Sequence, residues 1–233
     1  MILTLHQPQY LPYLGYFDKV AAADRFVLLD KPQFEKNDYQ NRNRVKTAAG
    51  PLWLSVPVLT KGKSGQALHE VEINPREDWQ RKHWATLELN YKKAPFWAHY
   101  APLLAPFYNQ PWARLVELNL AMYRFLSAEL GVSTPFEMES ELGSEGESTE
   151  RLISLCKKTG ADTYLSGAGG KAYMDEARFG EEGLSLRYQH YQHPVYRQQH
   201  MKQGFVPNLC VLDLLFNEGP ESRNLFRSTL LQE

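Results

Sequence analysis

The first thirty residues contain two apolar runs separated by one amphipathic run, and this arrangement constrains the fold more than any other feature of the sequence. Residues 2–5 form a short β-type run that ends at His6, and residues 25–30 form a second one. Between them, residues 16–23 place four apolar side chains on one face of a helix. A strand, a helix and a strand of this length make a βαβ unit with parallel strands. We therefore expect an α/β protein with a parallel, Rossmann-like sheet.

Polar side chains follow the first strand directly. Parallel sheets bind their ligands beyond the carboxyl ends of the strands. His6 and Asp30 stand at two such ends, so we expect both to face one crevice. The candidates near His6 are Gln7, Gln9, Tyr10, Tyr16 and Lys19. A histidine here can contact a phosphate or stabilise a developing negative charge, and the alternative is a purely structural histidine.

A dense polar run at residues 37–46 follows Gln33 and is expected to be a loop. The run is rich in amide and cationic side chains and has few apolar side chains that could pack in a core. The run is either a substrate-binding loop, in which Asn41 and Arg42 contact the ligand, or a solvated loop.

A glycine-rich run follows another strand, predicted at residues 163–166. Ser166 and Gly167 begin this run, and Lys171 lies within it. Glycines between a strand and a helix let the backbone approach an anion closely, and Lys171 could neutralise that anion. A plain turn is the alternative.

Three histidines lie in a polar stretch at residues 189–200, after a strand predicted at 184–188. Strand alternation puts His190 and His193 on opposite faces, and no cysteine or convincing carboxylate joins them, so we expect no metal there. His193, Tyr196 and Gln198 are expected to hydrogen-bond a polar ligand, unless the stretch is only solvated.

The remaining segments complete an α/β pattern around an aromatic-rich helical region. We expect strands at residues 52–58 and 68–73, helices from Trp79 to Leu130, an acidic loop at 137–147, a helix at 151–160 capped by Ser148 or Thr149, and an apolar helix at 209–216. Residues 1–233 are expected to form one unit. Residues 77–133 are either a helical subdomain or cap inserted in the α/β core, or one flank of that core.

Composition narrows the class of partner. The 26 basic and 27 acidic side chains give a net charge of −1, which argues against nucleic acid as the main partner. No apolar run approaches the roughly 18 residues of a membrane span, and the N-terminus lacks the layout of a signal peptide, so we expect a cytoplasmic protein. Cys156 and Cys210 lie in apolar runs and are expected to be buried thiols.

Several long strings resemble the WbqC-like protein family of bacteria. They are residues 6–19, 30–34, 41–43 and 164–167 with Tyr173 and Asp175, and then residues 193–196 and 213–217. The resemblance spans nearly the whole chain. It implies a part in surface-polysaccharide pathways, such as those of O-antigen and lipopolysaccharide, with addition of an acyl or aminoacyl group to an amino sugar.

A weaker resemblance is to the nucleotidylyltransferase superfamily. Its pattern has Gly-His at the start of the first helix, where this chain has Gly15-Tyr16. The missing imidazole is one that stabilises the transferring phosphate in that superfamily. Adenylyl transfer is therefore the further alternative.

We predict an enzyme, a group transferase or ligase, and the competing hypothesis is a non-catalytic protein that binds a sugar or sugar nucleotide. His6, Lys19, Arg42 and Lys171 are the predicted catalytic residues. The predicted substrate-binding residues are Gln7, Gln9, Tyr10, Tyr16, Asp30, Gln33, Asn41, Ser166, Gly167, Tyr173, Asp175, His193, Tyr196 and Gln198. The expected ligand is small and polar or anionic, with a nucleotide or acyl-activated donor and no tightly bound metal.

Overall fold

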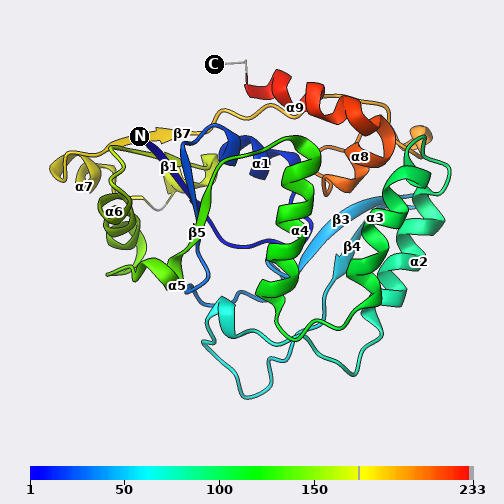
Figure 1. Ribbon diagram of the computed structural model, residues 1–233, viewed down its shortest axis with the longest axis horizontal. Helices are drawn as coiled ribbons and strands as arrows, with labels where there is room; N and C mark the ends of the chain where they lie inside the picture. The colour runs from blue at the N-terminus through cyan, green and yellow to red at the C-terminus, as the bar shows by residue number, and fades with distance from the viewer. Residues whose placement is uncertain (173, 231–233) are drawn as a thin grey trace.

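A computed structural model describes residues 1–172 and 174–230, and its centre is a five-stranded sheet (Figure 1). The strands lie in the order β5 (Phe136–Met138), β2 (Arg25–Leu28), β1 (Ile2–His6), β6 (Thr163–Ser166) and β7 (Ser185–Tyr188). Every neighbouring pair is parallel. This confirms the α/β class and the parallel, Rossmann-like sheet.

The central position of β1 follows from its sequence, because both of its faces are buried. Leu3 and Leu5 pack in one core cluster with residues of α6 (Ser148–Thr159) and with Phe179 of α7 (Glu176–Glu181). Thr4 is fully buried, and its hydroxyl donates to the Leu165 carbonyl oxygen at 2.8 Å. The chain extends the sheet on one side of β1 through β2 and β5, and then returns to add β6 and β7 on the other side. The strand order therefore reverses between β1 and β6.

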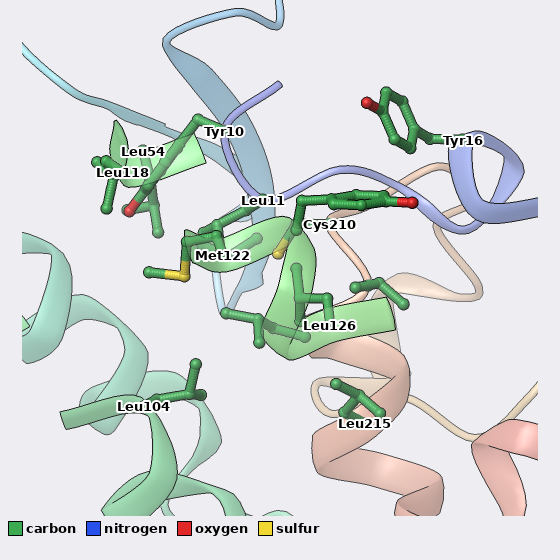
Figure 2. Close-up of a cluster of buried hydrophobic side chains, with 14 of the residues drawn as sticks. Tyr10, Leu11, Tyr16, Leu54, Leu104, Leu118, Met122, Leu126, Cys210 and Leu215 are labelled. Carbon is green, nitrogen blue, oxygen red and sulfur yellow. The ribbon is translucent and has the colours of Figure 1, made fainter. Parts of the chain in front are cut away.

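The opposite face of the sheet carries the larger core. It joins α1 (Leu14–Ala21), α8 (Leu212–Glu218) and α9 (Ser222–Leu230) with the helical region. Figure 2 shows Met122 and Leu126 of α4 (Leu115–Leu130) close to Cys210 and Leu11. Both cysteines are buried free thiols, as predicted.

The helical region enters between β2 and β5, which are neighbours in the sheet. A hairpin of β3 (Arg42–Thr47) and β4 (Gly50–Ser55) comes first, followed by the 3₁₀ turn η1 (Leu68–Glu70), α2 (Trp79–Tyr91), α3 (Trp97–Asn109) and α4. The aromatic side chains here are mostly core material, since Trp79, Tyr91, Tyr100 and Tyr108 are all buried. The positions of α2, α3 and α4 confirm the helices predicted from Trp79 to Leu130. That residues 77–133 form a cap remains a prediction.

The shorter elements are α5 (Glu139–Leu142), η2 (Ala168–Ala172), η3 (Met201–Gln203) and η4 (Gly219–Glu221). In the described part of the chain no helix is both long enough and apolar enough to cross a membrane.

Two predicted loops are partly regular structure. Residues 37–46 include most of β3, whose alternation is hidden because Arg42 and Arg44 alternate with buried Asn43 and Val45. Residues 137–147 include most of β5 and all of α5. A three-residue edge strand carries too few side chains to show a period.

Two local predictions are wrong. Residues 68–73 begin as a 3₁₀ turn, because the Leu68 N–H donates to Pro32 and the His69 N–H donates to Asp30. Neither Ser148 nor Thr149 caps α6. The N-cap is Glu147, and the Thr149 hydroxyl instead accepts a hydrogen bond from the Asp175 N–H.

Candidate functional site

A cavity of about 1120 Å³ lies at the carboxyl ends of β1 and β6, where the strand order reverses. This is the place where open α/β sheets bind their ligands. Its floor comes from the two strand ends and from α1, and is formed by His6, Gln7, Ser166, Gly167, Gly15, Tyr16 and Lys19. The βαβ unit and the glycine-rich run therefore meet at one site.

Lys19 is an amine held in the floor of the cavity with no carboxylate beside it in the described part of the chain. Its side chain is 4% exposed, and Nζ donates a hydrogen bond to the Leu5 carbonyl oxygen at 2.9 Å. Burial lowers the pKa of Lys19 to about 7, because the apolar surroundings disfavour the ammonium form. Near neutral pH the amine therefore exchanges readily between its two protonation states.

His6 lies next to Lys19 and is held as a neutral imidazole. Its ring centroid is 4.7 Å from that of Tyr16, and Nδ1 is 3.2 Å from the Gln7 carbonyl oxygen. Burial lowers the pKa of His6 well below its usual value, and the positive charge of Lys19 lowers it further. Because Nδ1 faces a carbonyl oxygen, it carries the proton of the neutral ring, and Nε2 remains an acceptor for a ligand N–H or O–H.

Two glycines of the site are required by close packing. A Cβ on Gly15 would lie 2.5 Å from the Tyr13 ring and 2.8 Å from the Tyr191 ring. A Cβ on Gly170 would lie 2.2 Å from the Ser166 hydroxyl oxygen. A side chain at either position would displace residues that line the cavity.

The charges around the cavity favour an anionic ligand. Among the described residues that line it, Lys19, Arg44 and Arg151 are basic and Asp38 alone is acidic. Arg151 is oriented by the buried carboxylate of Glu139, whose Oε1 lies 3.5 Å from Arg151 Nε. Because Glu139 offsets the charge of Arg151, Arg44 and the protonated form of Lys19 are the lining cations without an ion-pair partner among the described residues, and they could attract a phosphate or carboxylate group.

The model of the WbqC-like protein family matches residues 7–225 of the chain. The chain belongs to the WbqC-like protein family. A curated relative is also 38% identical over 227 residues, which is 97% of each chain. It is the "Uncharacterized protein Rv1507c" of Mycobacterium tuberculosis (strain ATCC 25618 / H37Rv). No solved structure is significantly similar to this chain.

The cavity of this WbqC-like protein brings together six of the predicted site residues. They are His6, Gln7, Tyr16, Lys19, Ser166 and Gly167. Tyr16 is fully buried, and its hydroxyl donates to the Gln7 carbonyl oxygen at 3.5 Å.

Other predicted residues near the first two strands have structural contacts outside the cavity lining. The Tyr10 hydroxyl is buried 2.9 Å from His83 Nδ1, and the Asp30 carboxylate accepts from the Ser140 N–H at 2.9 Å. Gln9 is buried, Gln33 forms an isolated β-bridge with Ala67, and the Asn41 amide donates to the Val56 carbonyl oxygen. Asp30 therefore does not share the cavity with His6.

Three more predicted residues belong to the stretch around residue 173. Lys171 is exposed, and its Nζ lies 5.0 Å from the centroid of the Tyr188 ring. Asp175 caps the N-terminus of α7 by accepting from the Arg178 N–H. Tyr173 lies outside the described residues.

His193, Tyr196 and Gln198 do not line the cavity and instead contact one another and Asp213. Asp213 accepts hydrogen bonds from Tyr91, Tyr196 and Gln198 at 2.8–2.9 Å, and Lys46 donates to Gln198 at 3.0 Å. His193 stacks on Tyr196, with 6.1 Å between the ring centroids. This network anchors the stretch that follows β7.

Several other residues that line the cavity were not predicted from the sequence. They are Tyr13, Asp38, Tyr39, Arg44, Ser148, Arg151, Gln189, His190, Tyr191 and Asn208. Gln189 directly follows β7, so its position at a strand end was a usable signal. Its amide donates to the Gly15 carbonyl oxygen at 2.8 Å, which fixes this wall onto α1. In residues 1–172 and 174–230 no group of three metal-ligating side chains is close enough to hold an ion.

Proposed function

We propose that this WbqC-like protein is a group transferase or ligase that transfers an acyl or aminoacyl group to an amino sugar in bacterial surface-glycan biosynthesis. The glycan context rests on the family resemblance. The chemistry rests on one observation, the amine of Lys19 with a pKa of about 7 in the cavity where the strand order reverses. A general base works best when its pKa is near the working pH.

Lys19 would act as the proton carrier of this reaction. A neutral amine can donate one N–H to the Leu5 carbonyl oxygen and keep its lone pair for a substrate proton. As the acceptor nitrogen attacks the acyl carbonyl carbon, its proton passes to Lys19 Nζ. The bond to the leaving group then breaks, and the Lys19 ammonium returns the proton to that group. Neutral His6 would orient the acceptor by hydrogen bonds.

The substrate class follows from the charge of the lining. Arg44 and Arg151 suit a phosphate-containing donor such as a nucleotide sugar or an acyl thioester with a nucleotide handle. The volume of about 1120 Å³ is sufficient for a ligand of that size. We place the reaction in the cytoplasm as part of the same proposal.

The test begins with a thermal-shift panel of ATP, nucleotide sugars, acyl-CoAs and amino acids, with and without Mg²⁺. A donor that stabilises the protein is then assayed for turnover with amino sugars. Lys19→Ala should reduce turnover by about 10²–10⁴-fold and still bind the donor. The wild-type pH profile should show an apparent pKa near 7 that the variant lacks.

Each competing hypothesis predicts a different outcome of these experiments. Unchanged turnover in Lys19→Ala would refute the role of the amine. A nucleotide sugar that binds without turnover in the presence of any donor would support the non-catalytic binding protein. Stabilisation by ATP with release of pyrophosphate would support adenylyl transfer.

A further inference from the structure

Arg44 is the cation of the β3–β4 hairpin that lines the cavity. Arg42 and Arg44 are two residues apart on β3 and therefore lie on the same face of the hairpin. Arg44 pairs in register with Trp53 of β4. Arg44 belongs to the cavity lining, whereas Arg42 does not.

The two arginines differ in what surrounds their guanidinium groups. Arg42 donates to the carbonyl oxygen and to the side chain of Asn37, and its Cζ lies 4.2 Å from the Trp53 ring centroid. The Cζ of Arg44 lies farther from that centroid, at 5.5 Å. No hydrogen bond or ion pair reaches the guanidinium of Arg44 from the described residues, and its Nε is buried without a partner. The same is true of Nε in Arg42, but its Nη groups have acceptors.

An unpaired guanidinium beside a cavity points to a missing anion. Arg44 is half-buried, and a buried N–H that lacks an acceptor, such as its Nε–H, costs free energy unless a ligand or water accepts from it. Arg44 has no carboxylate within 4 Å among the described residues, even though Asp38 lines the same cavity. The Asp38 carboxylate accepts instead from the N–H of Tyr39.

A second orphaned donor belongs to the same cavity. The Tyr191 hydroxyl is buried with no hydrogen-bond partner among the described residues. Its ring is 6.2 Å from that of Tyr13, and Tyr13 forms a β-bridge with Cys210, whose N–H donates to the Arg44 carbonyl oxygen. Arg44, Tyr13 and Tyr191 all line the same cavity, and these contacts connect the segments that carry them. The oxygen atoms of an anionic ligand in the cavity could accept from both the Arg44 Nε–H and the Tyr191 O–H.

We propose that Arg44 and Tyr191 form an oxyanion subsite that binds a phosphate or carboxylate group of the substrate. The proposal rests on the proposed function and specifies its substrate as a molecule with a fixed negative charge. A guanidinium suits this task because its planar fork can donate two parallel hydrogen bonds to one oxyanion.

Isothermal titration with two probes, inorganic pyrophosphate and malonate, tests the subsite and distinguishes phosphate from carboxylate. Arg42→Gln is the matched control, because it removes a cation from the same hairpin face outside the cavity lining. At low salt we expect the wild type and Arg42→Gln to bind one probe with affinities within about twofold. Arg44→Gln should weaken binding by roughly 10–100-fold, the range of a charge-assisted hydrogen bond.

Two milder variants cover the case in which Arg44→Gln does not fold. Arg44→Lys keeps the charge and loses the fork, and Tyr191→Phe removes only the hydroxyl oxygen, so each should weaken the same probe by about 3–10-fold. The inference is overturned if the wild type binds neither probe saturably, or if changes at Arg42 and Arg44 weaken binding equally.

Kinetics separate this inference from the proposed function. With a turning-over substrate, Arg44→Lys should raise KM, whereas Lys19→Ala should lower kcat. If probe binding depends on Arg44 but Lys19→Ala turns over normally, the subsite stands and the acid/base proposal fails. If Lys19→Ala loses turnover but Arg44 variants bind the probe normally, only the subsite fails.

Discussion

Replacing Lys19 by methionine should stabilise the protein, because it removes an amine that the fold keeps partly uncharged. In the unfolded chain the lysine pKa is 10.5, and in the fold burial lowers the pKa to about 7. At roughly 1.4 kcal/mol per pH unit, the folded state loses on the order of 5 kcal/mol relative to a lysine that stays solvated. Methionine has similar length and no charge to desolvate.

The lost hydrogen bond offsets part of this gain. Lys19 Nζ donates to the Leu5 carbonyl oxygen, and leaving a buried carbonyl without that donor costs about 1–3 kcal/mol. The variant should therefore be more stable than the wild type by about 2–4 kcal/mol at or below pH 7.

The pH dependence of the stability difference tests the reasoning more sharply than its size at one pH. Between about pH 7 and 10.5 the unfolded chain binds a proton at Lys19 that the folded protein has lost, so wild-type stability rises with pH. The free energy of unfolding of Lys19→Met should therefore exceed that of the wild type by less and less as the pH rises through this window. Near the upper end of the window the wild type should become the more stable protein. Groups whose pKa does not depend on Lys19 cancel in the difference, and His6, whose pKa does, titrates below this window.

Urea unfolding of both proteins at about pH 6.5, 8 and 9.5 measures this difference, provided that the m-values agree. Lys171→Met removes an exposed lysine and should change stability by no more than about 0.5 kcal/mol. A Lys19→Met variant that is less stable than the wild type at the lowest pH, or whose advantage is independent of pH, would show that the Lys19 ammonium is not desolvated.

Two further substitutions test the packing around the site by urea unfolding. Gly170→Ala should lower the free energy of unfolding by about 1–3 kcal/mol, because its Cβ would lie 2.2 Å from the Ser166 hydroxyl oxygen. Gly169→Ala is the control and should be nearly neutral, because its Cβ would meet nothing within 4 Å. Equal effects of the two substitutions would contradict this reasoning. Asp213→Ala should cost about 3–5 kcal/mol, because the donors of Tyr91, Tyr196 and Gln198 lose their acceptor and each unsatisfied buried donor costs about 1–3 kcal/mol. A loss below about 1 kcal/mol would show that water replaces the carboxylate.

Local sequence patterns were sufficient for the parts of the site that lie on the βαβ unit. The end of β1 at His6 and the glycines after β6 follow from runs of four or five residues, and the strand-end rule places them at one edge. Lys19 was identified because it lies close to His6 in the sequence, in the segment that resembles the family. Its protonation behaviour could not be predicted, since it depends on burial by residues far away in the chain.

The walls of the cavity could not be predicted because they depend on register and tertiary contacts. Residues 37–46 were expected to be a loop, and even the alternation of β3 does not separate Arg42 from Arg44, because both lie on one face; only the tertiary fold places Arg44 at the cavity. Asp30 is at a strand end as expected, but Ser140 of α5 binds its carboxylate and keeps it out of the cavity. Tyr191 lies on Gly15 only because the stretch after β7 folds back across α1.

The order of the strands in the sheet also determines when each strand can find its neighbours during synthesis. β1 is made first and can pair with β2 at once, but its other neighbour, β6, begins at Thr163. At typical elongation rates, one edge of β1 therefore stays unpaired for on the order of ten seconds before β6 is synthesised. An apolar strand with an open edge can pair with other chains. We expect ribosome-bound chains that end before β6 to bind chaperones, and longer chains to be released from them.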